Sequence, residues 1–308
     1  MKRTLKDYSL ISLKGIAMGA ADVVPGVSGG TIAFITGIYE ELLGAVKAVN
    51  LPNLKLLLKG NFKLFWGAVN GNFLLSLFAG IAVSFLTLAK LVTYLLDNHS
   101  VLVWSFFFGL VVASAIYVMK DVEDWNLIKV ISLLVGVAVA YAITTIAPAE
   151  PNTHYWFIFI SGAIAICAMI LPGVSGSFIL LLLGMYKYIM QSLSELNLVV
   201  IATFVVGAGV GIITFSNVFS WLLKKYYHAT IALLSGFMIG SLNKIWPWKE
   251  VVETYIDRHG EARPLIEQNI LPWQHQDPQF MWAVILIIIG FALIFVIESL
   301  SSKHKTKV

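Results

Sequence analysis

The chain has 308 residues, of which 58% are hydrophobic and only 12% are charged, and its formal net charge is +4. Together with a mean hydropathy of +0.84, this composition excludes a soluble globular domain and indicates an integral membrane protein. A single cysteine excludes an intramolecular disulfide, and six histidines without HxxxH or HxH spacing argue against a metal site, so we expect no metal and no cofactor.

The first apolar segment follows a basic N-terminus and is interrupted by Pro-Gly-Val-Ser-Gly at residues 25–29. The same five residues recur at 172–176, again inside an apolar segment. The match continues outward at a constant separation of 147 residues, and the aligned pairs include Gly15 with Gly162, Ala21 with Ala168, Gly37 with Gly184 and Tyr39 with Tyr186. This repetition predicts that the chain contains two copies of one unit.

Later segments align too, at slightly different separations. Their aligned pairs include Gly80 with Gly207, Gly109 with Gly236 and Gly136 with Gly290. We therefore predict a single transmembrane domain over residues 1–308, in which repeat one covers about 8–148 and repeat two covers about 155–300.

Two segments outside the repeated apolar runs are richer in charged residues. Residues 51–66 place Lys55, Lys59 and Lys63 on one side, next to leucine and phenylalanine, which predicts a basic amphipathic helix in the cytoplasmic interface. An outer loop is predicted at 246–280, where acidic residues outnumber basic ones and several tryptophans fit an interfacial aromatic belt.

Six charge-poor runs are long enough to cross a hydrocarbon core that needs about 20 helical residues. They lie at about 76–96, 101–119, 130–147, 199–223, 229–245 and 281–299. The segments around the motif are shorter, because the second motif separates apolar arms at 157–171 and 178–190. At about 1.5 Å per residue neither arm spans the membrane, so each motif segment is predicted to be a re-entrant hairpin.

The distribution of lysine and arginine supports this topology. With six spans and two hairpins, fifteen basic residues fall on the cytoplasmic side and five on the outer side, whereas spanning motif segments would remove the bias. Three spans per copy place the copies in opposite orientations, with both termini cytoplasmic. The predicted fold is thus an all-α polytopic membrane protein with two inverted-topology repeats, each a re-entrant helical hairpin plus three transmembrane helices.

The paired motifs are the main candidate site. Proline ends the first arm of each hairpin, and Ser28 or Ser175 stands at the expected N-cap of the second arm. Free backbone N–H groups at such helix starts favour an anion, and phosphate suits them. The candidate phosphate-binding residues are Pro25, Gly26, Val27, Ser28, Gly29, Gly30, Thr31, Pro172, Gly173, Val174, Ser175, Gly176 and Ser177. The alternative is that these small residues only permit close helix packing.

Ionisable residues in apolar segments are the next candidates, because they are costly there and usually functional. Asp22 is the best of them and would carry a coupling ion, a proton or sodium; its counterpart in the second copy is Met169. Lys14 either pairs with Asp22 or, as we favour, extends to the cytoplasmic surface. Glu40 fits an interfacial position, and Lys90 aligns with Asn217, which favours a shared polar role.

The chain resembles the bacterial PopT family of polyprenyl-phosphate (undecaprenyl-phosphate) translocases. The resemblance is carried by residues 15–31, which contain Asp22 and the first motif, by Gly-Ile-Tyr-Glu at 37–40 and by the second motif segment at 169–178. The resemblance covers nearly the whole chain. It implies a multi-pass protein of the bacterial cytoplasmic (inner) membrane that is a lipid transporter rather than an enzyme. Such a protein returns undecaprenyl phosphate from the outer to the inner leaflet for reuse in peptidoglycan and other envelope polymers. The implied partners are that lipid and the surrounding membrane lipids, with no nucleic acid.

Two other functions use the same sequence features. A secondary transporter of a small soluble anion such as phosphate would place the same two loops along a closed aqueous path. An intramembrane phosphatase is less favoured, because its chemistry needs a nucleophile next to an arginine or lysine clamp or a metal, and no such cluster is present in the sequence.

Overall fold

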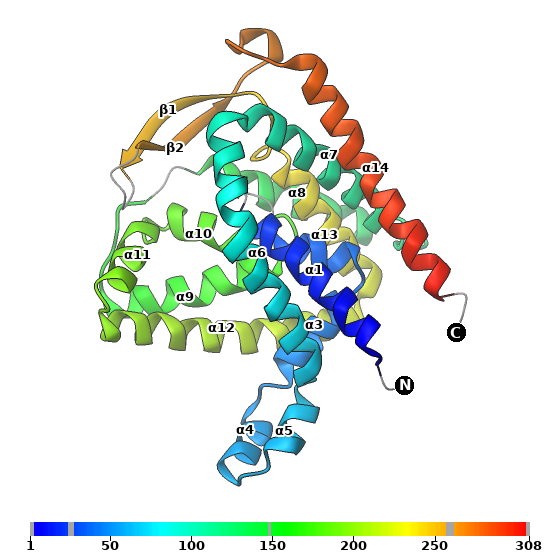
Figure 1. Ribbon diagram of the computed structural model, residues 1–308, viewed down its shortest axis with the longest axis vertical. Coiled ribbons are helices and arrows are strands. Elements are labelled where there is room, and N and C mark those ends of the chain that lie inside the picture. Colours follow the sequence, from blue (N-terminus) through cyan, green and yellow to red (C-terminus); the bar gives the residue numbers. More distant parts are fainter. Residues whose placement is uncertain (1–2, 24–27, 147–148, 257–261, 306–308) are drawn as a thin grey trace.

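The computed structural model describes residues 3–23, 28–146, 149–256 and 262–305, which are mainly helical (Figure 1). The first half contains α1 (Leu5–Val23), α2 (Gly29–Ile35), α3 (Tyr39–Lys47), α4 (Leu51–Leu58), α5 (Phe62–Ala68), α6 (Gly71–Asn98), α7 (Ser100–Met119) and α8 (Leu127–Thr145). The second half contains α9 (Tyr155–Ile170), α10 (Gly176–Leu182), α11 (Tyr186–Ser194), α12 (Leu198–Lys225), α13 (Tyr227–Ser241), β1 (Lys249–Ile256), β2 (Ala262–Asn269), the short 3-10 turn η1 (Pro272–Gln274) and α14 (Phe280–Lys305).

Glycines that align between the two halves make matching helix crossings. Gly15 of α1 lies against the backbone of α6 at Leu77, and Gly162 of α9 lies against the backbone of α12 at Phe204. In both places a Cβ atom would collide with a carbonyl oxygen, so only glycine permits the close approach. Small residues therefore have a packing role at these crossings in both halves.

The remaining long helices pair across the halves. α7 packs along α14, where Gly109 and Gly290 each meet the backbone of the other helix. α8 packs along α13, where Gly136 lies against Gly236. Because Gly109 aligns with Gly236 and Gly136 with Gly290 in the sequence, the two contacts are equivalent under the repeat.

Both halves also end a short helix in the same way. α2 and α10 stop at glycines with positive φ, +71° at Gly37 and +69° at Gly184, and each glycine is followed two residues later by the tyrosine that begins the next helix. Glycine reaches this left-handed conformation at little steric cost. The expected continuous arm at 178–190 is therefore wrong, because α10 and α11 are separate helices bent by 109°.

Four helices of the described chain are long and apolar enough to span a membrane, or five if the bent pair α10 and α11 counts as one span. They are α6, α7, α8 and α12. Of the other two predicted spans, α13 has only 15 residues, and the apolar stretch of α14 over Phe280–Val296 is shorter than a full span. The structure thus supports a polytopic membrane protein. Large exposed side chains such as Leu86, Leu134 and Val205 give these helices apolar outer faces suited to lipid.

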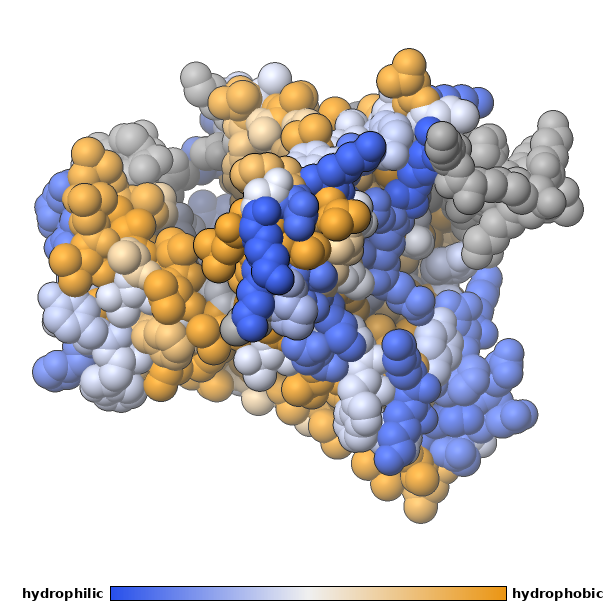
Figure 2. Space-filling view, turned by 90° about the horizontal axis from the view of Figure 1, so that it is seen from below, coloured by the Kyte–Doolittle hydropathy of each residue, from blue (hydrophilic) through white to orange (hydrophobic). Residues whose placement is uncertain are grey.

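The segment 51–66 is not the single amphipathic helix that its pattern predicts. α4 ends at Leu58, and α5 begins at Phe62. Gly60 adopts a φ of +74° between them, which stops the first helix. Both short helices project from one end of the molecule (Figure 1), and the face on that end has hydrophilic residues gathered at its centre and right (Figure 2).

The segment predicted as an outer loop contains the antiparallel hairpin β1–β2, which the sequence reading did not anticipate. It lies at the opposite end of the molecule from α4 and α5 (Figure 1). Two indole N–H groups fix its base, since Trp246 donates to the carbonyl of Ile270 and Trp248 donates to that of Pro278. The hairpin is therefore anchored between the end of α13 and the start of α14.

Candidate functional site

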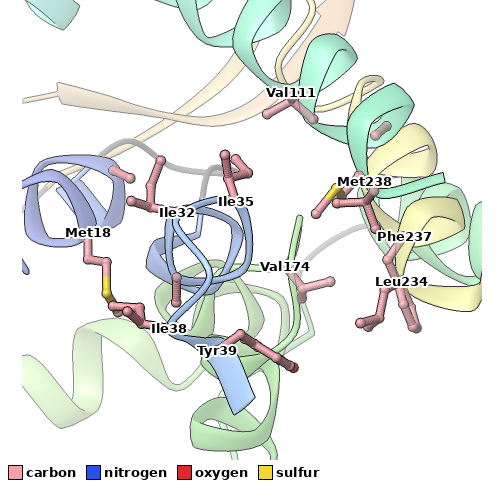
Figure 3. Close-up of a cluster of buried hydrophobic side chains, with 14 of the residues drawn as sticks. Met18, Ile32, Ile35, Ile38, Tyr39, Val111, Val174, Leu234, Phe237 and Met238 are labelled. Atoms are coloured by element: carbon pink, nitrogen blue, oxygen red, sulfur yellow. The ribbon is translucent and has the colours of Figure 1, made fainter. Parts of the chain in front are cut away.

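The two motif loops are in direct contact with each other. Ser28 Oγ donates to the carbonyl of Met169 at 3.1 Å, and the N–H of Gly173 donates to Thr31 Oγ1 at 3.0 Å. Val174 of the second loop lies between α2 and α13 in the buried core (Figure 3). The segments that match at a separation of 147 residues therefore meet at one place. Pro25, Gly26 and Val27 lie outside the described residues.

In the first loop, the N–H groups at the start of α2 already have acceptors, one of which is the carboxylate of Asp22. Gly29 N–H donates to Asp22 Oδ1 at 2.7 Å, Gly30 N–H donates to Ser28 Oγ at 3.1 Å, and Thr31 N–H donates to the carbonyl of Ser28 at 2.9 Å. Ser28 and Thr31 are fully buried. The expectation of free N–H groups at the start of α2 is therefore wrong in this conformation, because a carboxylate and an N-cap serine already occupy them.

The second loop is arranged differently. Ser175 makes no side-chain cap to α10, and its Oγ instead lies 2.9 Å from Ser177 Oγ. Within the described parts of the chain, no acceptor is recorded for the N–H groups of Gly176, Ser177 and Phe178. The sequence contains the reason, since Met169 stands where Asp22 stands in the first copy and cannot accept a hydrogen bond of that kind. The second loop thus keeps the open helix start that both loops were predicted to have.

A cavity of about 1220 Å³ connects the second loop to the β-hairpin. Asp22 and the second-loop residues Ser175, Gly176 and Ser177 line its inner end. Its apolar wall comes from helices of both halves and includes Phe85, Trp104, Ile166, Met169, Leu193 and Phe204. Of the predicted phosphate-binding residues that the structure describes, only those three of the second loop line this space. The described residues of the first loop, together with Pro172, Gly173 and Val174, pack behind it.

The hairpin end of the cavity carries a charged cluster that sequence reasoning missed. Glu267 Oε2 lies 3.0 Å from Lys244 Nζ and 3.4 Å from Lys249 Nζ. The β-hairpin register brings Glu267 opposite Val251, diagonally across from Lys249. The pattern of charges in the sequence alone predicts an acidic outer loop, and it does not reveal which of those charges turn inward.

Burial strongly affects this cluster. Desolvation is the largest influence on the pKa of Lys249 and lowers it to about 7, while the Glu267 carboxylate acts in the opposite direction. Burial would raise the pKa of Glu267, but the two nearby ammonium groups outweigh it and hold that pKa below its ordinary value. The cluster therefore places two amines and one ionised carboxylate in a poorly hydrated place, and Lys249 is only partly protonated near pH 7.

Three other polar candidates, Lys14, Glu40 and Asn217, do not line the cavity. Lys14 Nζ donates to the carbonyl of Thr36 at 2.7 Å, where α2 ends, rather than extending to the surface or pairing with Asp22. Glu40 is exposed at the start of α3, and Asn217 is exposed and donates to Ile213 of its own helix. The side chain of Lys90 lies outside the described residues.

Comparison with known proteins agrees with this picture of a membrane protein. A family model described as undecaprenyl phosphate translocase-like matches residues 18–263. A polyprenyl-phosphate transporter of Vibrio cholerae is 43% identical over 302 residues, covering 96% of this chain and 98% of that protein. A polyprenyl-phosphate transporter of Staphylococcus aureus is 32% identical over 253 residues, covering 76% of this chain and 85% of that protein. No solved structure gives a significant match.

Proposed function

The chain belongs to the undecaprenyl phosphate translocase-like family, and from that premise we propose that it transports polyprenyl phosphate across the bacterial cytoplasmic membrane. Undecaprenyl phosphate is the expected substrate, and its return from the outer to the inner leaflet is the expected direction. The protein acts as a transporter and not as an enzyme, and the returned carrier lipid is reused in envelope polymers such as peptidoglycan.

The observation that carries the proposal is the cavity between the second motif loop and the β-hairpin. Its inner end offers the unpaired N–H groups of Gly176 and Ser177 and the hydroxyls of Ser175 and Ser177. These donors suit a phosphate monoester. Its wall is apolar and includes Phe85, whose exposed fraction is 47%. The phosphate head therefore binds inside while the isoprenoid tail stays in contact with lipid.

Transport between leaflets requires the site to open to each side in turn. The matched glycine crossings, α1 with α6 and α9 with α12, support two structurally equivalent halves that move against each other. The excess of basic residues on the side of the termini supports an inverted arrangement with cytoplasmic ends. In the proposed cycle, these halves rock about the contact between the two motif loops.

Asp22 is proposed to couple transport to an ion, most simply a proton. It lines the same cavity as Ser175 and Ser177 and also accepts from Gly29 N–H. An ionised carboxylate and a phosphate repel each other in a medium of low dielectric constant, so a proton on Asp22 favours occupancy of the cavity by the head group. Sodium would neutralise the same charge.

The test is a leaflet-resolved measurement of undecaprenyl phosphate in cells depleted of this protein and of any redundant translocase. We expect the lipid to accumulate in the outer leaflet, and we expect the wild type to reverse this accumulation. The double variant Ser175→Ala with Ser177→Ala and the variant Asp22→Asn are each expected to reverse it at least about tenfold less well, because each removes a buried charge or donor. Glu40→Gln, which removes an exposed carboxylate outside the cavity, is the matched control and should act like wild type.

Two results would count against the proposal. An unchanged outer leaflet on depletion would favour transport of a small soluble anion by the same architecture. Full activity of correctly inserted Ser175→Ala with Ser177→Ala would keep the substrate but move the head-group site away from the second loop.

A further inference from the structure

Among the described residues, the cluster of Lys244, Lys249 and Glu267 sets two amines against one carboxylate. Exposed fractions of the three side chains are only 16%, 6% and 17%. Two of these groups also contact aromatic rings, since Lys249 Nζ lies 3.8 Å from the centre of the Trp104 ring and Lys244 Nζ lies 4.9 Å from that of Phe178. Aromatic faces ease the burial of a cation but do not cancel its charge.

The position of this cluster connects it with the site described above. All three residues line the cavity that reaches the second motif loop. Phe178, which contacts Lys244, directly follows Ser177 in the first turn of α10. A smaller cavity of about 530 Å³, lined by Thr144 and Asn269 among others, is bordered by the same three charged groups. An anion bound by the lysines therefore lies in the same cavity as Ser175 and Ser177 of the second loop.

A structural ion pair alone does not account for this arrangement. A buried pair that only stabilises a hairpin needs one cation for one carboxylate, and a second amine that shares the same carboxylate adds a desolvation cost without a second negative charge. The pKa of Lys249, lowered to about 7 although Glu267 is adjacent, agrees with incomplete compensation. The other carboxyl groups of the cavity, Asp22 and Asp97, belong to different walls, on α1 and α6.

We propose that Lys244 and Lys249 form a receiving site for a phosphate monoester at the hairpin end of the cavity, and that Glu267 occupies this site as an internal competitor until the phosphate displaces it. This inference rests on the proposed function and adds to it a second head-group position. In the proposed topology the hairpin faces the outside, so this position is the first that a lipid head from the outer leaflet meets.

Glu267 sets the affinity of this site in the proposed mechanism. One carboxylate oxygen now contacts both ammonium groups, which is the place that a phosphate oxygen would take. While Glu267 is ionised, it repels an incoming phosphate and keeps the lysines paired. Removal of that charge is therefore expected to strengthen binding, whereas removal of either lysine is expected to weaken it.

The test measures binding of farnesyl phosphate, a short polyprenyl monophosphate, to the full-length detergent-solubilised protein. Lys244→Gln and Lys249→Gln are each expected to bind at least about tenfold more weakly than wild type, as loss of one partner of a buried charge pair implies. Glu267→Gln is expected to bind roughly tenfold more tightly, a gain that a misfolded variant cannot imitate. Lys187→Gln removes an exposed lysine of α11 that does not line the cavity, and it should match wild type.

The outcomes separate the two proposals. If wild type binds farnesyl phosphate and both Lys244→Gln and Glu267→Gln bind it equally well, the receiving site is refuted while the transport proposal stands. If wild type binds inorganic phosphate as tightly as farnesyl phosphate, and Lys244→Gln and Lys249→Gln weaken both, the lysines receive phosphate but the substrate is a soluble anion. If wild type binds neither ligand, the receiving site and the proposed substrate are both rejected.

Discussion

Ser28 and Ser175 occupy equivalent positions in the repeated motif but have different surroundings. Ser28 is fully buried, caps α2 through Gly30 N–H and donates to the carbonyl of Met169 at the end of α9, next to the second loop. The Ser175 hydroxyl makes a hydrogen bond to the hydroxyl of Ser177, and Ser175 lines the cavity. At the scale of single residues, the first serine therefore holds the two loops together and the second is available to a ligand.

This difference predicts opposite effects of the same substitution. Ser28→Ala should lower the free energy of unfolding by about 1–2 kcal/mol, because it removes an N-cap and leaves a buried carbonyl without its donor. Ser175→Ala should change stability by less and ligand binding by more. Thermal unfolding of the two purified variants, compared with farnesyl phosphate binding, checks both statements. Equal loss of stability in the two variants would contradict the assignment.

At the scale of secondary-structure elements, the helix crossings depend on glycines that allow backbones to touch. α12 contains a useful contrast, because a Cβ at Gly207 would collide with the carbonyl oxygen of Phe159 whereas a Cβ at Gly209 would meet nothing within 4 Å. Both glycines are in the interior of the same helix. Only the first is required by packing.

The two glycines form a matched pair of substitutions. Gly207→Ala should destabilise the protein by about 1–3 kcal/mol, because α9 and α12 must move apart to admit the methyl group. Gly209→Ala should be neutral or stabilise by up to about 1 kcal/mol, because alanine favours the helix and restricts the unfolded chain. Thermal denaturation in detergent measures both. A stable Gly207→Ala variant would show that this crossing tolerates separation.

At the scale of the whole molecule, one cavity joins the second motif loop to the hairpin end, while the first loop packs behind it. The cavity therefore leads from Ser177 towards the hairpin end. On the side of the first loop, the two loops contact each other through the hydrogen bonds of Ser28 with Met169 and of Thr31 with Gly173. This asymmetry is what a carrier needs in one state of an alternating cycle.

Thiol labelling in intact cells tests the asymmetry. In a background where the single cysteine is replaced, Cys167→Ala, the variant Ser177→Cys should react with a membrane-impermeant reagent added from outside, because the cavity reaches it from the hairpin end. Ser28→Cys should not react, because its position is fully buried. Farnesyl phosphate should slow the labelling of Ser177→Cys. Labelling of Ser177→Cys only from the cytoplasmic side would reverse the proposed orientation of the cavity.

Much of the protein is readable from the sequence because hydrophobicity and repetition are local or periodic properties. The membrane class follows from composition, and the repeat follows from the identity of residues 25–29 and 172–176 and from the constant separation of pairs such as Gly15 and Gly162. That these two glycines lie at helix crossings is seen only in the structure. The divergence of Asp22 and Met169 was also visible, although its consequence, one occupied and one open helix start, required the hydrogen bonds of the folded chain.

What the sequence could not determine depends on contacts between distant segments. Glu267 reaches Lys249 only through the β-hairpin register, and both meet Lys244 only because tryptophans anchor that hairpin between α13 and α14. From the sequence, Lys244, Lys249 and Glu267 are simply charged residues in or next to a predicted outer loop, because the sequence gives the sign of each side chain but not its burial. Composition and repetition are enough to predict a membrane protein with paired glycine-rich breaks. Which break opens to a cavity and which charges line it are visible only in the folded chain, because burial and pairing are properties of packing.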